Sequence, residues 1–264
     1  MNPLSPADWH SRFMQQARWT RDLRAYLYPR AGLGNARRVL DVGCGTGAMS
    51  GELAEQVPLL HGLDIDRAHL RLAMGNAPVA ILTLGDAHNL PYPDGIFDIT
   101  LCHFALLWMN DPARVLREMA RVTCPGGAVL ALAEPDYGGR VDYPLELVQL
   151  GEWQMKSLRR QGTDPLMGRR LAGLFHGAGL QNVETGALGG QWIGTPDWEA
   201  WESEWAVLES DLDETCQVSG HPFQSESLKK TWQLLKALDK SAWQSGQRVL
   251  FVPTFYAWGR VSRR

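Results

Sequence analysis

A short apolar run that ends in alternating glycines constrains the fold of this chain more than any other segment. The run covers Arg38–Val42, and Gly43, Gly45 and Gly47 follow it at alternate positions. Glycine lets the backbone turn sharply and lets a ligand approach the main chain closely. A helix-like stretch over residues 48–56 comes directly afterwards. The segment therefore predicts a strand, a tight ligand-binding turn and a helix, which together form a nucleotide-binding unit.

The following residues repeat this alternation of apolar runs and helix-like stretches. Further runs of strand character cover residues 59–65, 79–84, 97–102 and 128–133. Between them, residues 67–74 have helical character, and Asp111 followed by Pro112 is a typical helix start. Alternating strands and helices predict parallel βαβ units, and almost continuously apolar strands suit a sheet that is covered on both faces.

Less regular segments flank this core. Apolar residues recur at helical spacing from Ala7 to Leu27, so we expect residues 1–34 to form an N-terminal helical cap. The remaining residues, 35–264, are expected to form one α/β domain. Its later part is predicted to hold helices over residues 145–160 and 166–177, and strands over 180–185 and 248–261.

A tryptophan-rich helical insertion is predicted over about residues 195–245 of this domain. Trp198, Trp201 and Trp205 are spaced so that they share one face of a helix. One interpretation is an aromatic lid over a bound acceptor of apolar, aromatic or cationic character. The other is a helix whose aromatic face packs on the core, and both interpretations stay open.

Composition excludes several classes of protein. The hydrophobic fraction of 45% and the charged fraction of 21% are those of a globular protein. A formal net charge of −3 gives no basic excess for binding nucleic acid, so no nucleic-acid partner is expected.

The four cysteines are too far apart for metal-ligand spacing, so we expect no metal site and buried thiols in a reducing compartment. The start of the chain does not read as a signal peptide and no long apolar run predicts a membrane span, so a cytoplasmic location is expected.

Two kinds of ligand fit the glycine turn. Gly43, Gly45 and Ala48 match the spacing of a dinucleotide fingerprint, and Asp64 lies at a suitable distance to hold ribose hydroxyls. A dinucleotide would, however, place its pyrophosphate beside the carboxylate of Asp41, which would repel it. A ligand with ammonium and sulfonium centres would be attracted by the same carboxylate. Asp86, after the third strand, is placed to accept a hydrogen bond from an adenine amino group.

Five motifs, in this order, resemble those of class I S-adenosylmethionine-dependent methyltransferases. They lie at residues 39–47, 62–66, 85–87, 97–98 and 121–127. The match extends from about Arg37 to Glu134 and is closest to the small-molecule branch that includes ubiquinone-biosynthesis-type enzymes. One departure is Thr123-Cys124, where the family commonly has Leu-Lys, at a position away from the cofactor in such folds.

The resemblance implies a Rossmann-like fold, a cofactor and a set of residues that bind it. The fold is a doubly wound, mostly parallel, seven-stranded α/β sheet with an antiparallel last strand. The cofactor is S-adenosylmethionine, with S-adenosylhomocysteine as product. Asp64 is expected on the ribose, and Asp41 or the loop amides on the methionine end. The full set of expected cofactor-binding residues is Asp41, Gly43, Cys44, Gly45, Gly47, Asp64, Ile65, Asp86, Ala87 and His103.

The acceptor is expected beyond the carboxyl ends of the fourth and fifth strands, because ligands of open α/β sheets bind at that edge. His103 follows the fourth strand and is the candidate general base, unless it only lines the cofactor. Glu134, Asp136 and Tyr137 follow the fifth strand. Glu134 and Tyr137 are further catalytic candidates, although this polar cluster could equally cap the next segment.

The sequence is compatible with four functions. The leading hypothesis is methyl transfer to a nitrogen, oxygen or carbon nucleophile of a small molecule. The alternatives are a methyltransferase acting on RNA or protein, an NAD-dependent oxidoreductase, and a protein that binds S-adenosylmethionine without turning it over. The carboxylates of Asp41 and Asp86 argue against the oxidoreductase, and the acidic charge balance argues against RNA.

Overall fold

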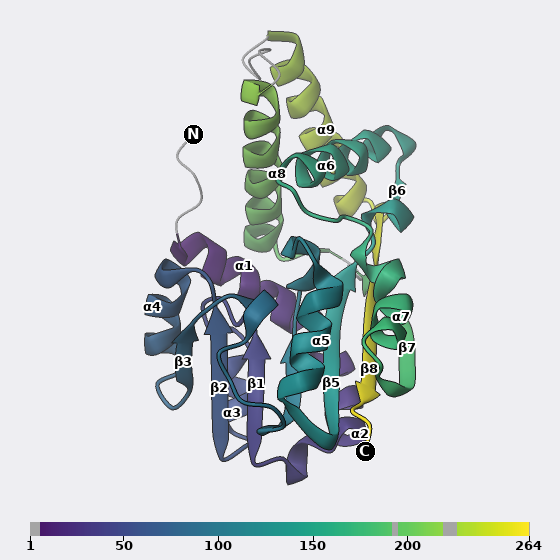
Figure 1. The fold of residues 1–264 in the computed structure, drawn as a ribbon. Helices are drawn as coiled ribbons and strands as arrows, with labels where there is room; N and C mark the ends of the chain where they lie inside the picture. The colour runs from purple at the N-terminus through teal and green to yellow at the C-terminus, as the bar shows by residue number, and fades with distance from the viewer. Residues whose placement is uncertain (1–5, 192–194, 219–225, 264) are drawn as a thin grey trace. The chain divides into compact units, whose positions relative to one another are not determined.

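The computed structural model describes residues 6–191, 195–218 and 226–263, which are traced in Figure 1. They fall into two compact units. The sheet unit consists of Ser5–Pro135, Met167–Leu188 and Thr254–Arg264. The helical unit consists mainly of Asp136–Leu166 and Gly189–Pro253. The helical unit is thus built from two insertions into the sheet unit, and the insertion predicted over residues 195–245 lies in the second of them.

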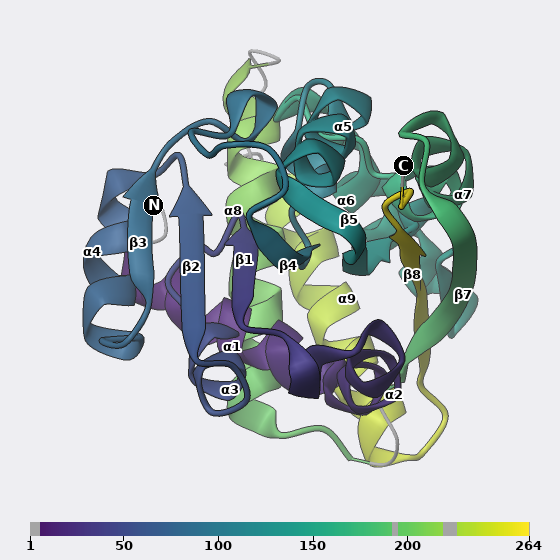
Figure 2. The same ribbon diagram turned by 60° about the horizontal axis from the view of Figure 1, so that its bottom comes forward.

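Five parallel strands form the centre of the sheet unit, in the order β3-β2-β1-β4-β5 (Figure 2). They are β1 (Arg38–Val42), β2 (Leu59–Asp64), β3 (Ile81–Leu84), β4 (Phe97–Cys102) and β5 (Thr123–Pro135). The last strand, β8 (Val249–Arg260), pairs with β5 in antiparallel orientation, and β7 (Gln181–Gln191) pairs with β8. The predicted mostly parallel α/β sheet with an antiparallel last strand is therefore confirmed.

The sheet has eight strands in the described part of the chain, one more than the resemblance implied. The additional strand is β6 (Val141–Tyr143), which pairs in antiparallel orientation with Val249–Phe251 of β8 inside the helical unit. Three residues are too few to show the alternation by which a strand is recognised in sequence. The strand forms here because β8 offers it a partner.

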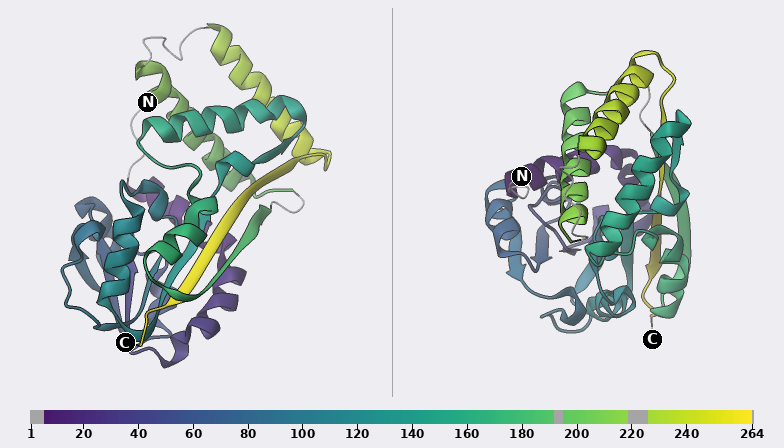
Figure 3. Two further views of the ribbon diagram at one scale, coloured as in Figure 1. Left: turned by 45° about the vertical axis from the view of Figure 1, so that its right-hand side comes forward. Right: turned by 90° about the horizontal axis from the view of Figure 1, so that it is seen from above.

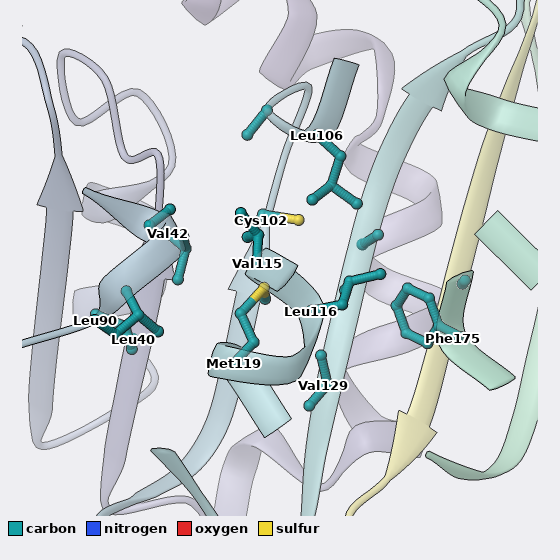
Figure 4. Packing of buried hydrophobic residues seen from close by; sticks show 14 of the residues in the cluster. Leu40, Val42, Leu90, Cys102, Leu106, Val115, Leu116, Met119, Val129 and Phe175 are labelled. Atoms are coloured by element: carbon teal, nitrogen blue, oxygen red, sulfur yellow. The ribbon is translucent and has the colours of Figure 1, made fainter. Parts of the chain in front are cut away.

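Helices cover both faces of the sheet, as a doubly wound fold requires. Side chains alternate along a strand, so Leu40 and Val42 pack on one face of β1 and Val39 packs on the other. The first face is covered by α5 (Pro112–Val122) and α7 (Met167–Gly177). Figure 4 shows their contribution to this core, with Leu116, Met119 and Phe175 beside the strands. The second face is covered by α2 (Arg21–Ala31) and α3 (Ser50–Ala54), and α4 (Arg67–Asn76) contacts β2 and β3.

The N-terminal segment forms two helices where one was expected. The first is α1 (Pro6–Trp19), and α2 follows after a break at Thr20, whose φ and ψ of −100° and 10° are not helical. Helical spacing was recognised only as far as Leu27, but α2 continues through Pro29, which lies near its end. The helix ends at Gly32, where a φ of +86° suits glycine and lets its amide bond to the last carbonyls.

In the described part of the helical unit, three α-helices lie side by side (Figure 3). They are α6 (Val148–Arg160), α8 (Trp198–Val218) and α9 (Glu226–Gln244). Their apolar core is rich in indole rings and consists of Leu147, Leu150, Trp201, Trp205, Trp232, Leu235 and Trp243. Across the described ranges, no helix has the length and apolar character needed to cross a membrane.

A buried network of charges holds this unit together around Asp239. Its Oδ2 atom accepts hydrogen bonds from the indole nitrogens of Trp201 and Trp205, at 2.6 and 3.0 Å. Its Oδ1 atom lies 2.5 Å from Arg248 Nε, and Arg248 also pairs with Asp142 at 2.7 Å. Trp201 and Trp205 are thus core residues of the helical unit, as the packing interpretation stated, and a lid role for residues 195–245 stays a prediction.

Candidate functional site

The loop after β1 takes backbone conformations that favour glycine. The φ angle is +73° at Gly43, +53° at Gly45 and +78° at Gly47, a region that L side chains rarely adopt. The loop is also closely packed. A Cβ atom added at Gly43 would lie 3.0 Å from the Ala105 side chain, and one at Gly45 would lie 3.1 Å from the ring of Phe13. Glycine is therefore needed here for both conformation and space.

Most amides of this loop are already bonded within the protein. The amides of Gly43 and Cys44 both donate to the carbonyl of Leu63, at 2.7 and 3.0 Å. The amide of Gly45 donates to Asp64, and that of Gly47 donates to the Cys44 carbonyl. Either Asp41 or the loop amides were predicted to hold the methionine end of the cofactor. Most of the loop amides already donate hydrogen bonds within the protein, so Asp41 is the better candidate.

Asp41 and Asp64 place two carboxyl groups at the ends of neighbouring strands. Asp64 Oδ2 accepts from Gly45 N at 2.7 Å, and Asp64 Oδ1 accepts from Asp66 N at 2.8 Å. Asp41 is buried, and its Oδ2 has no hydrogen-bond partner in the described part of the chain. Burial, reinforced by the negative charge of Asp64, raises the pKa of Asp41 to about 7. This buried carboxyl beside a second one favours a cationic group as its partner.

The ends of β2 and β3 carry two further predicted residues. Ile65 follows Asp64 directly and is 73% exposed, which is unusual for a side chain of this kind. Asp86 follows β3, and its Oδ1 atom accepts from His88 N at 2.9 Å and from His88 Nδ1 at 2.7 Å. These hydrogen bonds lower the pKa of Asp86. Both use Oδ1, so Oδ2 stays available to an adenine amino group.

Cys44 and Ala87, also predicted to bind the cofactor, are buried. Burial raises the pKa of the Cys44 thiol well above its usual value, so this group stays protonated. Ala87 begins the short η2 helix (Ala87–Asn89), which Asp86 caps. Cofactor contacts of both residues remain predictions.

His103 lies at the carboxyl end of β4, where the acceptor was expected. Its Nε2 atom lies 2.8 Å from the hydroxyl of Thr20. Burial of the ring, with the nearby positive charge of Arg24, lowers the pKa of His103 to about 3. The imidazole is therefore neutral at physiological pH and is a poor base, because an efficient general base has a pKa near the working pH. The geometry argues against His103 as the general base.

Glu134 is a structural cap in this fold. The side chain has no exposed surface and accepts hydrogen bonds from three successive amides: Ala105 at 3.0 Å, Leu106 at 2.8 Å and Leu107 at 3.1 Å. Burial raises the pKa of Glu134 to about 7, although the three amides oppose this rise. The acceptor-binding interpretation of Glu134 is not supported by this arrangement, in which its carboxyl group holds the loop between β4 and α5.

The other two residues of the predicted polar cluster belong to the helical unit. Asp136 caps the short η4 helix (Tyr137–Gly139) by accepting from Gly138 N at 3.0 Å. The Tyr137 amide donates to the Pro165 carbonyl at 2.9 Å. The capping interpretation therefore describes Asp136, and a catalytic role for Tyr137 stays a prediction.

Residues of α1 contact the glycine loop, which the sequence did not indicate. His10 Nδ1 lies 2.8 Å from the Thr46 hydroxyl, and Asn76 of α4 donates to the Thr46 carbonyl at 2.9 Å. Phe13 packs on Gly45 and meets His69 edge to face, with ring centroids 5.6 Å apart. These contacts join residues that are at least thirty positions apart, so no local pattern could have predicted them.

Phe104 has a backbone conformation that the sequence did not predict. It has a φ of +50°, which is uncommon for a bulky side chain and is often found at functional sites. Its amide donates to the Ala133 carbonyl at 2.9 Å, and its ring stands edge to face against His103. The conformation at the end of β4 is therefore fixed by β5 on one side and by ring packing on the other.

Comparison with known proteins identifies this arrangement. The family model of a methyltransferase domain matches residues 40–131, from the end of β1 to β5. Over residues 40–131 the chain therefore matches a methyltransferase domain. The match covers the glycine loop, Asp64, Asp86 and His103 together, so the matched region is the centre of the sheet unit.

Two curated relatives match over part of their length. The malonyl-[acyl-carrier protein] O-methyltransferase of Erwinia pyrifoliae is 36% identical over 118 residues, which is 45% of this chain and 45% of the relative. The demethylmenaquinone methyltransferase of Renibacterium salmoninarum is 35% identical over 121 residues, which is 45% of this chain and 51% of the relative. The chain thus spans about half the length of the curated relatives it matches.

A solved structure shares the fold over most of the chain. The crystal structure of a putative methyltransferase from Bacillus halodurans superposes with a TM-score of 0.59 at 18% identity. The alignment covers 91% of this chain and 99% of the other. At this level of identity the likeness shows a common fold.

Proposed function

We propose that this chain binds S-adenosylmethionine at the carboxyl ends of β1, β2 and β3 and transfers its methyl group to a small-molecule acceptor. The observation that carries the proposal is Asp41, whose buried Oδ2 atom has no hydrogen-bond partner among the described residues. An ammonium group is the natural partner for such a carboxyl, and S-adenosylmethionine carries one on its methionine end.

The other predicted residues fit the rest of the cofactor. A carboxylate offers about four lone-pair sites, and the two amides bonded to Asp64 leave room for ribose hydroxyls. The free Oδ2 atom of Asp86 suits the adenine amino group. The exposed side chain of Ile65 offers an apolar surface to the adenine ring. Together these groups match a ligand with a cationic end, a ribose and an adenine.

The protein's part in the reaction is to position the reactants and exclude water. S-adenosylmethionine supplies a methyl group that is already activated on a sulfonium centre. His103 is neutral, and Glu134 is committed to three amides, so neither is expected to remove a proton from the acceptor. The acceptor is then a nitrogen, oxygen or carbon nucleophile with a lone pair or carbanion available for attack.

The competing functions receive less support. A dinucleotide would place its pyrophosphate near Asp41 and Asp64, which would repel it. The two curated relatives are named for methyl transfer to demethylmenaquinone and to a malonyl group on an acyl carrier protein, and these names favour a small acceptor group over RNA. The remaining alternative is a protein that binds S-adenosylmethionine without turning it over. Only a direct assay of methyl transfer distinguishes it from an enzyme.

Methyl transfer can be tested with cofactor labelled on its methyl group. The purified chain would be incubated with a metabolite extract and the labelled cofactor, and products would be separated by mass. We expect label in a small molecule, and no label with Asp41→Asn at the same protein concentration. Asp94→Asn is the matched control, because Asp94 is an exposed carboxylate paired with Arg121. Tight cofactor binding with no labelled product from any extract would instead support a binding protein.

A further inference from the structure

The hydroxyl of Thr20 joins the N-terminal helices to the end of β4. Its Oγ1 atom lies 2.8 Å from His103 Nε2, 2.7 Å from Arg24 Nη1 and 3.1 Å from the Gln16 carbonyl. Thr20 and Arg24 are 4% and 3% exposed, so water does not compete strongly for these contacts. A buried hydroxyl with three close polar neighbours has little freedom to rotate.

Arg24 determines that the Thr20 hydroxyl accepts one of its hydrogen bonds. A guanidinium is always charged and only donates, so Thr20 must accept from it. Arg24 cannot turn away, because Glu52 holds its Nε and Nη2 atoms at 3.0 and 2.6 Å. Its Nη1 atom also donates to the Ala17 carbonyl at 2.5 Å. One of the two lone pairs on Thr20 Oγ1 is therefore committed to Arg24.

The remaining proton and lone pair fix the tautomer of His103. A hydroxyl donates one hydrogen bond and accepts two. The contacts of Thr20 are all satisfied when its proton is directed at the Gln16 and Ala17 carbonyls, at 3.1 and 3.4 Å, and its second lone pair accepts from His103 Nε2–H at 2.8 Å. A neutral imidazole with a proton on Nε2 has a bare lone pair on Nδ1. Among the described residues no hydrogen bond reaches that Nδ1 atom.

His103 lies where an acceptor would be expected. It follows β4 at the carboxyl edge of the sheet, which is where ligands bind in this class of fold. Part of the residue is exposed to solvent, although the surrounding protein desolvates the ring enough to lower its pKa. The contact with Thr20 uses Nε2, so Nδ1 is left for a second hydrogen-bond partner.

We propose that Thr20 is a positioning residue that holds His103 as the Nε2–H tautomer, so that Nδ1 accepts a hydrogen bond from a methyl acceptor carrying an N–H or O–H group. This inference rests on the proposed function and narrows it to protic nitrogen or oxygen nucleophiles. The hydrogen bond orients the nucleophile, whose lone pair attacks the methyl carbon as the bond from that carbon to the sulfonium sulfur breaks. S-adenosylhomocysteine is the leaving group, and the cationic methylated product then releases its proton to water. Arg24 and Glu52 contribute by fixing the direction of the Thr20 hydroxyl.

The tautomer can be measured directly by nitrogen-15 NMR of the histidine rings. Protonated and unprotonated ring nitrogens have well separated shifts, and His103→Asn assigns the His103 signals among the seven histidines. We expect protonated Nε2 in the wild type and in Thr20→Ser, which keeps the hydroxyl, and a mixture of tautomers in Thr20→Val. A wild-type protein protonated on Nδ1 would overturn the proposal, even if Thr20→Val failed to fold. Wild-type shifts retained in Thr20→Val would overturn it as well.

Kinetics test the role in acceptor positioning. With a protic acceptor, Thr20→Val should lower kcat/KM for the acceptor about five- to tenfold, the effect of one lost hydrogen bond. S-adenosylhomocysteine affinity should stay within about twofold of the wild type, and Thr20→Ser should restore turnover. Unchanged kcat/KM, or cofactor affinity that falls in parallel, would contradict the proposal. If the wild type does not bind S-adenosylhomocysteine, the proposed function fails, and the NMR result is unaffected.

Discussion

Asp64 accepts a hydrogen bond of 2.7 Å from the amide of Gly45, so the end of β2 holds the glycine loop that follows β1. The same carboxylate is the expected partner of the cofactor ribose. It therefore links the shape of the loop to the binding of the ligand.

Replacing Asp64 with alanine should weaken S-adenosylhomocysteine binding at least tenfold. Charge-assisted hydrogen bonds of this kind are worth about 1.5–3 kcal/mol, and the substitution also releases the Gly45 amide. Isothermal titration calorimetry measures the change, with Asp94→Ala as the control for loss of a carboxylate far from the loop. Equal affinity in Asp64→Ala and the wild type would remove Asp64 from the site.

Asp41 should make the ligand-free protein less stable as pH rises. Its pKa of about 7 lies above the ordinary value of 3.8, so between these values the folded state binds more protons than the unfolded state. The free energy of unfolding then falls as pH increases from about 4 to 7, by a total on the order of 2–4 kcal/mol. Urea titrations of the wild type and Asp41→Asn at several pH values isolate this contribution. A difference between the two proteins that does not change with pH would contradict it.

Protonation of His103 should cause no inflection in the pH profile of turnover between pH 5 and 8. The pKa of His103 is lowered to about 3, so the ring keeps one protonation state over that range. His103→Asn should lower turnover while retaining S-adenosylhomocysteine affinity and the shape of the pH profile. An inflection near pH 6.5 in the wild type that disappears in His103→Asn would restore its candidacy as a base.

Asp239→Ala should destabilise the helical unit by about 3–5 kcal/mol, because it leaves the charge of Arg248 without one of its buried partners. The indole nitrogens of Trp201 and Trp205 lose their acceptor as well. Glu202→Gln is the matched control, since it breaks an exposed pair with Lys236 that is worth about 0–1 kcal/mol. Tryptophan fluorescence during urea unfolding reports on this unit. Similar losses in the two variants would show that the Asp239 network contributes little.

Sequence reasoning worked where one short segment determines the structure. The glycine loop was predictable because alternate glycines after an apolar run have few other uses, and their positive φ angles agree with that interpretation. The roles of Glu134 and His103 were not predictable, because they depend on partners far along the chain. Glu134 bonds to amides nearly thirty residues away, and His103 bonds to Thr20 across 83 positions.

The strand β6 and the division of the N-terminal helix illustrate a second limit. Val141–Tyr143 is a strand only because β8 lies beside it, and three residues show no periodicity of their own. Thr20 breaks the helical segment although its neighbours keep helical spacing, and its hydroxyl bonds to His103 and Arg24. In both places tertiary contacts override the local pattern.

The most direct test of the proposed function is calorimetric titration of the wild-type chain with S-adenosylhomocysteine and, separately, with NADH. Binding of S-adenosylhomocysteine in the micromolar range, with no heat from NADH, is the predicted result, because Asp41 and Asp64 favour a cationic ligand over a pyrophosphate. Binding of NADH alone would contradict the proposal and would direct the search to oxidisable substrates.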